Sequence, residues 1–233
     1  MLGMRHGTIL VTVGAVGVIL ATGSIAGGVG YGRWHWIRGA GLGWFALNLI
    51  ILGLAHAREG HGLFGKRREG TLPLWSKVAF LPLFVVQSAV WHLVRLGPRN
   101  PKYQVVAPGL IVGRRPWLWE DPPACTTLVD LTSEYQESVR ARRHPGYRCL
   151  PLLDGSAPSP RVLVEFIDAL PLGETFVHCA QGHGRAGLFA VVWMLRRGNA
   201  RSVEEALKAI KAVRPRVTLN ATQRRCAEEC FLC

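Results

Sequence analysis

Residues 174–190 read Glu-Thr-Phe-Val-His-Cys-Ala-Gln-Gly-His-Gly-Arg-Ala-Gly-Leu-Phe-Ala, and the interpretation of the whole chain begins from this stretch. The short apolar run 175–177 predicts a buried strand, and the apolar run 187–197 predicts a helix. A glycine-rich loop lies between them. A strand, a glycine loop and a helix in this order place backbone N–H groups at a helix N-terminus, where they bind anions. The stretch therefore predicts an oxyanion cradle.

The loop and the residues beside it carry reactive side chains. Cys179 precedes the loop, and the N–H groups and helix dipole that bind an anion also stabilise a thiolate, so this cysteine is expected to be nucleophilic at neutral pH. Arg185 offers a planar fork that matches two phosphoryl oxygens. We predict that His178 contributes a hydrogen bond near the nucleophile. The predicted substrate-binding residues are those of the loop together with His178: Ala180, Gln181, Gly182, His183, Gly184 and His178.

The order of histidine, cysteine, five residues and arginine at 178–185 resembles the signature of the cysteine-dependent protein tyrosine and dual-specificity phosphatases. The resemblance extends from about Tyr103 to about Cys226. It implies a mainly parallel sheet flanked by helices, and hydrolysis of phosphate monoesters through a phosphocysteine formed on Cys179. It also implies that Arg185 and the loop hold the phosphoryl oxygens, and that neither a metal nor another cofactor is needed.

Asp154 is the predicted general acid. Phosphoryl transfer to a thiol requires a proton for the departing oxygen and then a base for the attacking water. Asp154 lies on the loop 154–160, and an aspartate on a loop upstream of the cysteine resembles the acid of that family. The alternative is a turn or N-cap aspartate. Asp130, at a strand end, and Asp168, within the predicted helix 160–170, are poorer candidates.

Ala186 departs from the family pattern, which usually has serine or threonine directly after the arginine. That hydroxyl helps the cysteine to leave when the phosphocysteine is hydrolysed. Its absence predicts slow turnover. A pseudophosphatase that binds phosphorylated partners without turning over is the alternative.

Residues 1–97 are expected to form an all-α transmembrane region. The chain has 49% hydrophobic residues, and the excess lies in three apolar segments of this part, 8–31, 39–57 and 78–94. They predict two or three transmembrane helices. The third segment has only 17 residues and contains Pro, Gln and His, so an interfacial helix is an alternative to the span that we favour. A signal peptide is an alternative interpretation of the first segment.

Residues 98–233 are expected to form the catalytic domain, after a linker at 97–101. With three spans the Lys and Arg residues divide equally between the two sides, so they do not set the orientation. A reactive thiol survives best in a reducing compartment, which predicts that this domain is cytoplasmic.

The remaining pattern of the catalytic domain predicts alternating strands and helices. Two short strands are expected within 103–116, and buried strands at 126–131 and 147–153. A capping box at 202–205 predicts a helix that runs to 213. The six cysteines do not suggest a disulfide framework. Cys125 and Cys149 are expected to be buried thiols, and a terminal helix is expected to carry Cys226, Cys230 and Cys233 on one face.

The expected partners are the membrane and a phosphorylated substrate. We favour phosphotyrosine, phosphoserine and phosphothreonine in proteins, with a phospholipid or phosphoinositide as the alternative. The loop 180–184 lacks the lysines typical of phosphoinositide-specific relatives. The formal charge of +13 suits anionic lipid headgroups or phosphorylated substrates. Nucleic acid is not expected, because no binding motif accompanies the charge.

Overall fold

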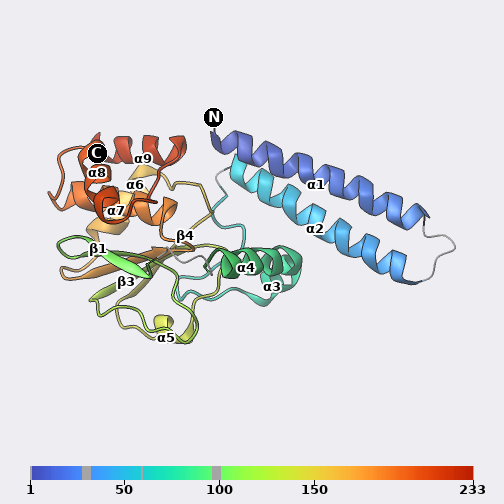
Figure 1. The fold of residues 1–233 in the computed structure, drawn as a ribbon, viewed down its shortest axis with the longest axis horizontal. Helices are drawn as coiled ribbons and strands as arrows, with labels where there is room; N and C mark the ends of the chain where they lie inside the picture. Colours follow the sequence, from blue (N-terminus) through green and yellow to red (C-terminus); the bar gives the residue numbers. More distant parts are fainter. Residues whose placement is uncertain (1, 28–32, 59, 96–100, 233) are drawn as a thin grey trace.

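The computed structural model describes residues 2–27, 33–58, 60–95 and 101–232 (Figure 1). The predicted linker 97–101 lies outside the described residues except for Pro101, as do Cys233 and the end of the first apolar segment.

A five-stranded sheet lies at the centre of the C-terminal region. Its strand order is β1-β2-β5-β3-β4, with β1 antiparallel to β2 and the other neighbours parallel. The carboxyl ends of the parallel strands meet at one edge of the sheet, where the loops of an α/β fold form binding sites. The strands are β1 (Tyr103–Ala107), β2 (Leu110–Arg114), β3 (Thr127–Thr132), β4 (Tyr147–Leu152) and β5 (Thr175–Cys179).

Helices cover both faces of this sheet (Figure 1). Four of them pack on one face and enclose the main hydrophobic core. On the other face the short helix α5 (Val139–Arg142) covers a smaller apolar cluster that includes Leu128 and Phe176. The predicted α/β class, with a mainly parallel sheet flanked by helices, is confirmed. The four helices are α6 (Pro160–Asp168), α7 (Gly184–Arg196), α8 (Val203–Val213) and α9 (Ala221–Leu232).

The helix after the cradle begins earlier than the sequence pattern predicts. The N–H of Gly187 already donates to the carbonyl of His183, so Gly184 and Arg185 form the first turn of α7. The predicted start at residue 187 reflected only the apolar run. The arginine therefore extends from a rigid helical turn instead of a loop.

The N-terminal region begins with two antiparallel helices, α1 (Leu2–Gly27) and α2 (Arg33–Ala57), which project from the sheet domain (Figure 1). They pack closely at glycines: a Cβ added at Gly14 would lie 2.7 Å from the carbonyl oxygen of Ala46, and one at Gly17 would lie 2.9 Å from the Ala46 side chain. Among the described residues one helix, Trp36–Ala57, is long and apolar enough to cross a bilayer.

The third apolar segment, 78–94, forms the end of α3 (Leu74–Ala79) and most of α4 (Leu81–Arg95), which are separated at Phe80. α4 lies against the catalytic loops: Trp91 Nε1 donates to the carbonyl of Ala180, and the hydroxyl of Tyr135 donates to the carbonyl of Gln87. This packing suits the interfacial alternative better than a third span, because one side of α4 is committed to the catalytic domain.

A second hydrophobic cluster joins the two regions. Phe64, from the connection between α2 and α3, makes an edge-to-face contact with Phe80 at 5.0 Å between ring centroids. Leu52 of α2 and Leu153, which follows β4, belong to the same buried cluster. The packing therefore continues across the domain boundary predicted at residue 97.

Candidate active site

The cradle forms where β5 ends and α7 begins. Gly182 has φ +74°, and its N–H donates to Cys179 Sγ at 3.2 Å. A Cβ at Gly182 would collide with the carbonyl of Gly113 on β2, so this turn requires glycine. The thiol of Cys179 thus lies buried at the N-terminus of α7, where backbone N–H groups favour negative charge.

Arg185 is 1% exposed and is held in one orientation. Its Nη1 and Nη2 donate to the two carboxylate oxygens of Glu134 at 2.8 and 2.7 Å, and Nη1 also donates to the carbonyl of Leu152. Burial lowers the pKa of Arg185, but Glu134 and Asp154 outweigh this and hold the pKa well above its usual value. Within the described part of the chain its Nε–H has no acceptor, which leaves a buried donor for an anion.

Asp154 lies beside this arginine, with Oδ1 3.1 Å from Arg185 Nη2 and a side chain that is 83% exposed. The backbone of its loop is held from two directions. His56 Nε2, at the end of α2, makes a 3.0 Å hydrogen bond with the carbonyl of Asp154. Gln223 Nε2, on α9, donates to the carbonyl of Ser156 at 3.2 Å. The carboxylate is therefore open to solvent while its backbone is fixed.

The two rival aspartates lie elsewhere. Asp130 is fully buried and pairs with Lys66 at 2.6 Å. Asp168, at the end of α6, pairs with Arg196 of α7 at 2.6 Å. Neither aspartate lines the cavity that Asp154 forms with Ala180 and Gln181 of the cradle.

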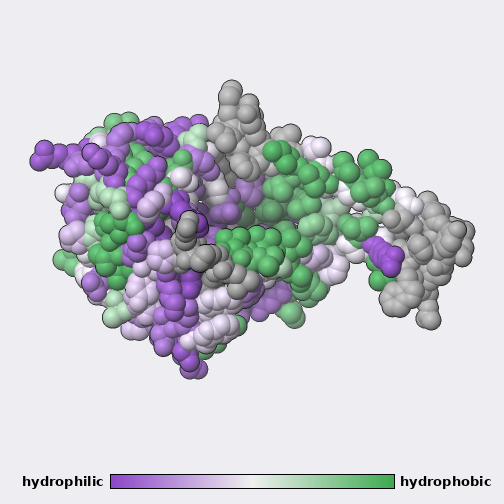
Figure 2. All heavy atoms as spheres, viewed as in Figure 1, coloured by the Kyte–Doolittle hydropathy of each residue, from purple (hydrophilic) through white to green (hydrophobic). Residues whose placement is uncertain are grey.

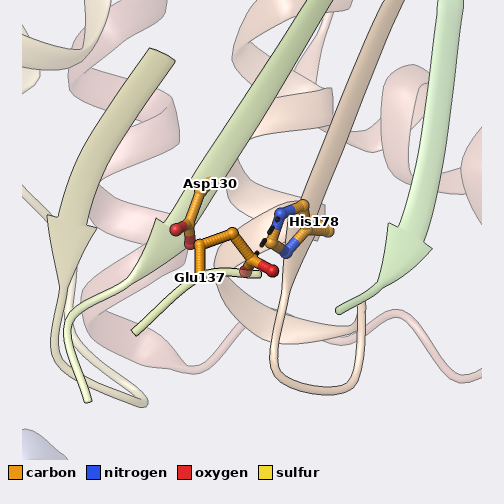
Figure 3. Close-up of side chains that lie close together, drawn as sticks. All are labelled: Asp130, Glu137 and His178. Atoms are coloured by element: carbon orange, nitrogen blue, oxygen red, sulfur yellow. Dashed lines mark ion pairs between the residues drawn. The ribbon is translucent and has the colours of Figure 1, made fainter. Parts of the chain in front are cut away.

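His178, Asp130 and Glu137 form a buried cluster behind the cradle (Figure 3). One ligand-type atom from each lies within 4.8 Å of the others, and His178 Nε2 is 3.8 Å from Glu137 Oε2. These side chains are of the types that bind metal ions. Both carboxylates, however, already have a cationic partner, because Lys66 lies 2.6 Å from Asp130 and Arg115 lies 3.2 Å from Glu137. The cluster is therefore an ion-pair network.

The surroundings of His178 determine its charge and its role. Burial lowers the pKa of His178, so its ring is neutral at pH 7. Burial alone would raise the pKa of Asp130, but Lys66 and the other cationic neighbours hold it well below its usual range. His178 lies in this network and does not line the cavity beside Asp154. His178 therefore does not make the hydrogen bond to the nucleophile or substrate that we expected. Its buried ring supports β5, the strand that leads to Cys179.

The other loop residues divide between the cavity and its support. Ala180 and Gln181 line a cavity of about 300 Å³ together with Asp154. His183 is half-buried, and burial together with nearby arginines lowers its pKa to about 4, so it is neutral at pH 7. Gly184 leaves room for Gln223, whose amide nitrogen lies 3.3 Å from the position of an added Cβ.

Several residues that shape the site were not identified from the sequence. Glu134 orients Arg185, and the only sequence signal for it is an acid just beyond the strand 127–132. Arg214 donates to the carbonyls of Gly182 and Gln181 and so holds the backbone of the cradle loop in place. Trp91, His56 and Lys66 come from the N-terminal region, and no local pattern links them to the cradle.

Comparison with known proteins gives a match in structure. No family model and no curated protein matches the chain. Solved structures similar to it include dual-specificity and protein tyrosine phosphatases, and a human tyrosine phosphatase-like serine/threonine/tyrosine-interacting protein. Tk-PTP in its active form is 23% identical, over 57% of this chain and 97% of that chain, with a TM-score of 0.47. Human DUSP28 is 20% identical, over 59% of this chain and 99% of that chain, with a TM-score of 0.49. PTPMT1 in complex with PI(5)P is 15% identical, over 57% of this chain and 96% of that chain, with a TM-score of 0.46.

Proposed function

We propose that the chain is a membrane-anchored phosphatase that hydrolyses phosphate monoesters through a phosphocysteine. The observation that carries the proposal is the arrangement around Arg185. A buried, permanently charged guanidinium with an unpaired N–H lies beside the acid Asp154, and Cys179 lies at the same helix N-terminus. Each of these groups has a role in one reaction.

In the first step the Cys179 thiolate attacks phosphorus. An S–P bond forms, the bond from phosphorus to the leaving oxygen breaks, and Asp154 gives its proton to that oxygen. Arg185 and the loop N–H groups stabilise the charge on the equatorial oxygens of the transition state. Glu134 keeps the guanidinium in place, so little reorganisation is required.

In the second step the Asp154 carboxylate takes a proton from water, and the oxygen attacks phosphorus. The S–P bond breaks, the thiolate leaves and phosphate is released. Ala186 is buried beside the cradle and offers no hydroxyl to the leaving thiolate. We expect this step to be slow, so that the phosphocysteine accumulates.

The test uses the full-length protein in detergent with p-nitrophenyl phosphate. Cys179→Ser is expected to lower phosphate release by about a thousandfold or more. Cys125→Ser, which changes a half-buried thiol outside the cradle, is the matched control. Release that survives Cys179→Ser would overturn the proposal. A phosphocysteine that forms once and never hydrolyses would instead identify the non-turning pseudophosphatase, the alternative that Ala186 favours.

The membrane placement rests on apolar surface and helix length. Trp36–Ala57 has 22 residues and is apolar enough to cross a bilayer, and α1 packs along it. We place α1 and α2 in the bilayer as a hairpin and α3–α4 at its surface. In this placement the start of α1 and the end of α2, which lie near the sheet domain, are on the same side of the membrane as the catalytic domain.

This placement also supports one orientation over the other. Of the nine Lys and Arg residues in 1–97, seven then lie on the catalytic side, and only Arg33 and Arg38 lie on the other. By the positive-inside rule the catalytic domain is cytoplasmic. Protease added to sealed, right-side-out cells should leave a C-terminal tag intact, and should remove it only after the membrane is permeabilised. Cleavage in sealed cells would contradict this orientation.

A further inference from the structure

A cavity of about 380 Å³ lies between the helical hairpin and the catalytic domain. Its catalytic end is polar and contains Asp154 and Glu134, the two acids that contact Arg185. Its other end is apolar and is formed mainly by side chains of α1, of α2 and of the segments that pack on them. The apolar lining consists of Ile9, Leu10, Leu52, Phe64 and Leu153.

The cavity beside the cradle continues this one. Its volume is about 300 Å³, and it shares Gln87, Glu134 and Asp154 with the larger cavity, so the two adjoin beside Arg185. Three valines of α4, spaced one helical turn apart, form its outer wall: Val86, Val90 and Val94. The space that leads away from the cradle is thus bordered by apolar side chains of the N-terminal helices.

These apolar walls are continuous with the exposed apolar surface of the molecule. Figure 2 shows hydrophobic residues over α4 and along the α1–α2 hairpin, whereas the catalytic domain is mostly hydrophilic on this face. All three valines, Val86, Val90 and Val94, are themselves exposed. α2, the helix suited to crossing a bilayer, ends at His56 and Ala57, directly against the Asp154 loop. The catalytic acid therefore lies at the level where the apolar helix ends.

We propose that the substrate is a membrane lipid that carries a phosphate monoester, with an acyl chain lying in the groove between the α1–α2 hairpin and α4. The inference rests on the phosphatase function proposed above. Valine and leucine side chains provide apolar contact but neither donate nor accept hydrogen bonds. A bound phosphopeptide would bury backbone polar groups against them without partners, which is costly. An acyl chain has no such groups, and it gains free energy for each CH₂ removed from water.

The geometry also explains how a lipid phosphate reaches a buried thiol. A lipid at the surface of the bilayer can move its chain sideways between the hairpin and α4 without leaving the apolar phase. Its phosphate then enters the cradle beside Arg185 and Asp154. Exposed basic side chains in the connection after α2, including Arg58, Arg67 and Arg68, suit the anionic surface of such a membrane.

The experiment compares four substrates with the full-length protein in vesicles of phosphatidylcholine. They are dioleoyl phosphatidic acid, its water-soluble dibutanoyl analogue, a phosphotyrosine peptide and p-nitrophenyl phosphate. We expect kcat/KM for the dioleoyl lipid to exceed that for the dibutanoyl analogue by at least about a hundredfold, because burial of a few CH₂ groups accounts for this factor. Equal values for the two lipids, or a preference for the phosphopeptide, would overturn the inference.

Val90→Asp tests the groove itself. A carboxylate in the apolar wall should lower the ratio of kcat/KM for the dioleoyl lipid to that for p-nitrophenyl phosphate by about tenfold or more. Val162→Asp is the matched control, because Val162 lies on α6 away from the groove and is similarly exposed, at 44% against 52% for Val90. Co-sedimentation with vesicles checks that both variants remain membrane-bound. An unchanged ratio for Val90→Asp would overturn the inference.

The two proposals fail in different ways. If p-nitrophenyl phosphate is hydrolysed in a Cys179-dependent manner but the acyl chain gives no advantage, the lipid inference fails and the phosphatase stands. If none of the four substrates is hydrolysed and no phosphocysteine forms, both proposals fail.

Discussion

The two regions of the molecule differ in whether their apolar side chains are buried or exposed. In the catalytic domain the apolar residues of the central strands and of α7 are almost completely buried. In the α1–α2 hairpin many of them face outward, and Ile19 is 68% exposed. A helix pair with apolar side chains around much of its surface is stable only where the surroundings are also apolar. The apolar surface of the hairpin is the part of the molecule that we propose the bilayer covers, whereas the sheet domain buries its apolar residues within itself.

Residues 60–95 do not belong clearly to either region. By composition they continue the apolar N-terminal part, but Phe64, Lys66 and Trp91 pack into the catalytic domain or onto its cradle. We propose that the structural boundary lies near residue 60, and that this segment is part of the catalytic unit. Four changes to the chain test how the two regions differ and where they meet.

The largest expected effect comes from truncation. A chain of residues 98–233 loses Lys66, Phe64 and Trp91, which leaves Asp130 buried without its cation and Leu153 exposed. We expect it to lose cooperative unfolding, whereas a chain of residues 60–233 should unfold cooperatively in mild detergent. Thermal unfolding followed by circular dichroism gives the measurement. If both chains melt cooperatively at the same temperature, the boundary belongs near residue 97.

Lys66→Met isolates the buried ion pair within that segment. Removing one partner leaves the Asp130 carboxylate uncompensated in the protein interior, which costs about 3–5 kcal/mol. Urea unfolding of the full-length protein should register the loss in the free energy of unfolding. Arg68→Met, two residues away and exposed, serves as the control and should change stability by less than about 0.5 kcal/mol. Equal effects of the two substitutions would mean that Lys66 is not a link between the regions.

Ala186→Ser concerns the catalytic region alone. A hydroxyl next to Arg185 is expected to stabilise the departing thiolate and to raise steady-state turnover by about tenfold. Rapid-quench kinetics with p-nitrophenyl phosphate should show an initial burst of product in the unmodified protein and a smaller burst in the variant. A burst of the same size and rate in both would place the slow step elsewhere.

The smallest effect concerns the pH dependence of stability. Burial and neighbouring arginines lower the pKa of His183 to about 4, whereas the unfolded chain titrates near 6.5. Between these values the unfolded chain binds more protons, so stability rises with pH from about 4 to 6.5 and is lost as the pH falls through this window.

His183→Asn should therefore flatten this part of a plot of melting temperature against pH. His178, whose pKa is also lowered by burial, acts in the same direction and remains in the variant, so some slope should persist. An unchanged slope would show that His183 does not titrate differently in the folded protein.

The sequence predicted most of the catalytic fold because its signals are local. The turn at Pro108 and Gly109, the apolar strands, and the glycine loop before α7 each depend on neighbouring residues. The same holds for the capping box, in which the Ser202 hydroxyl accepts the N–H of Glu205. The choice of Asp154 came from its loop upstream of Cys179 and from the resemblance to the phosphatase family, and the structure brings it to Arg185.

The parts that could not be predicted depend on contacts between distant residues. Lys66 belongs to the basic run Lys66-Arg67-Arg68, and nothing near it in the sequence indicates that Asp130 and Thr132 surround its ammonium group. His178 was assigned to the substrate because it adjoins Cys179, but alternation along β5 directs it to the opposite side, into the buried network (Figure 3). Gln223 is buried where it donates to the carbonyl of Ser156 in the Asp154 loop, a contact that no local pattern predicts.

The Lys66–Asp130 contact also imposes an order on biosynthesis. The two residues are 64 positions apart, and the ribosome releases Lys66 first, together with the hairpin before it. Strand β3 can bury Asp130 at low cost only when the ammonium group is already in place. The central sheet can therefore bury Asp130 only once the segment that carries Lys66 lies against it, so residues 60–95 act as an internal partner that β3 needs before the sheet is complete.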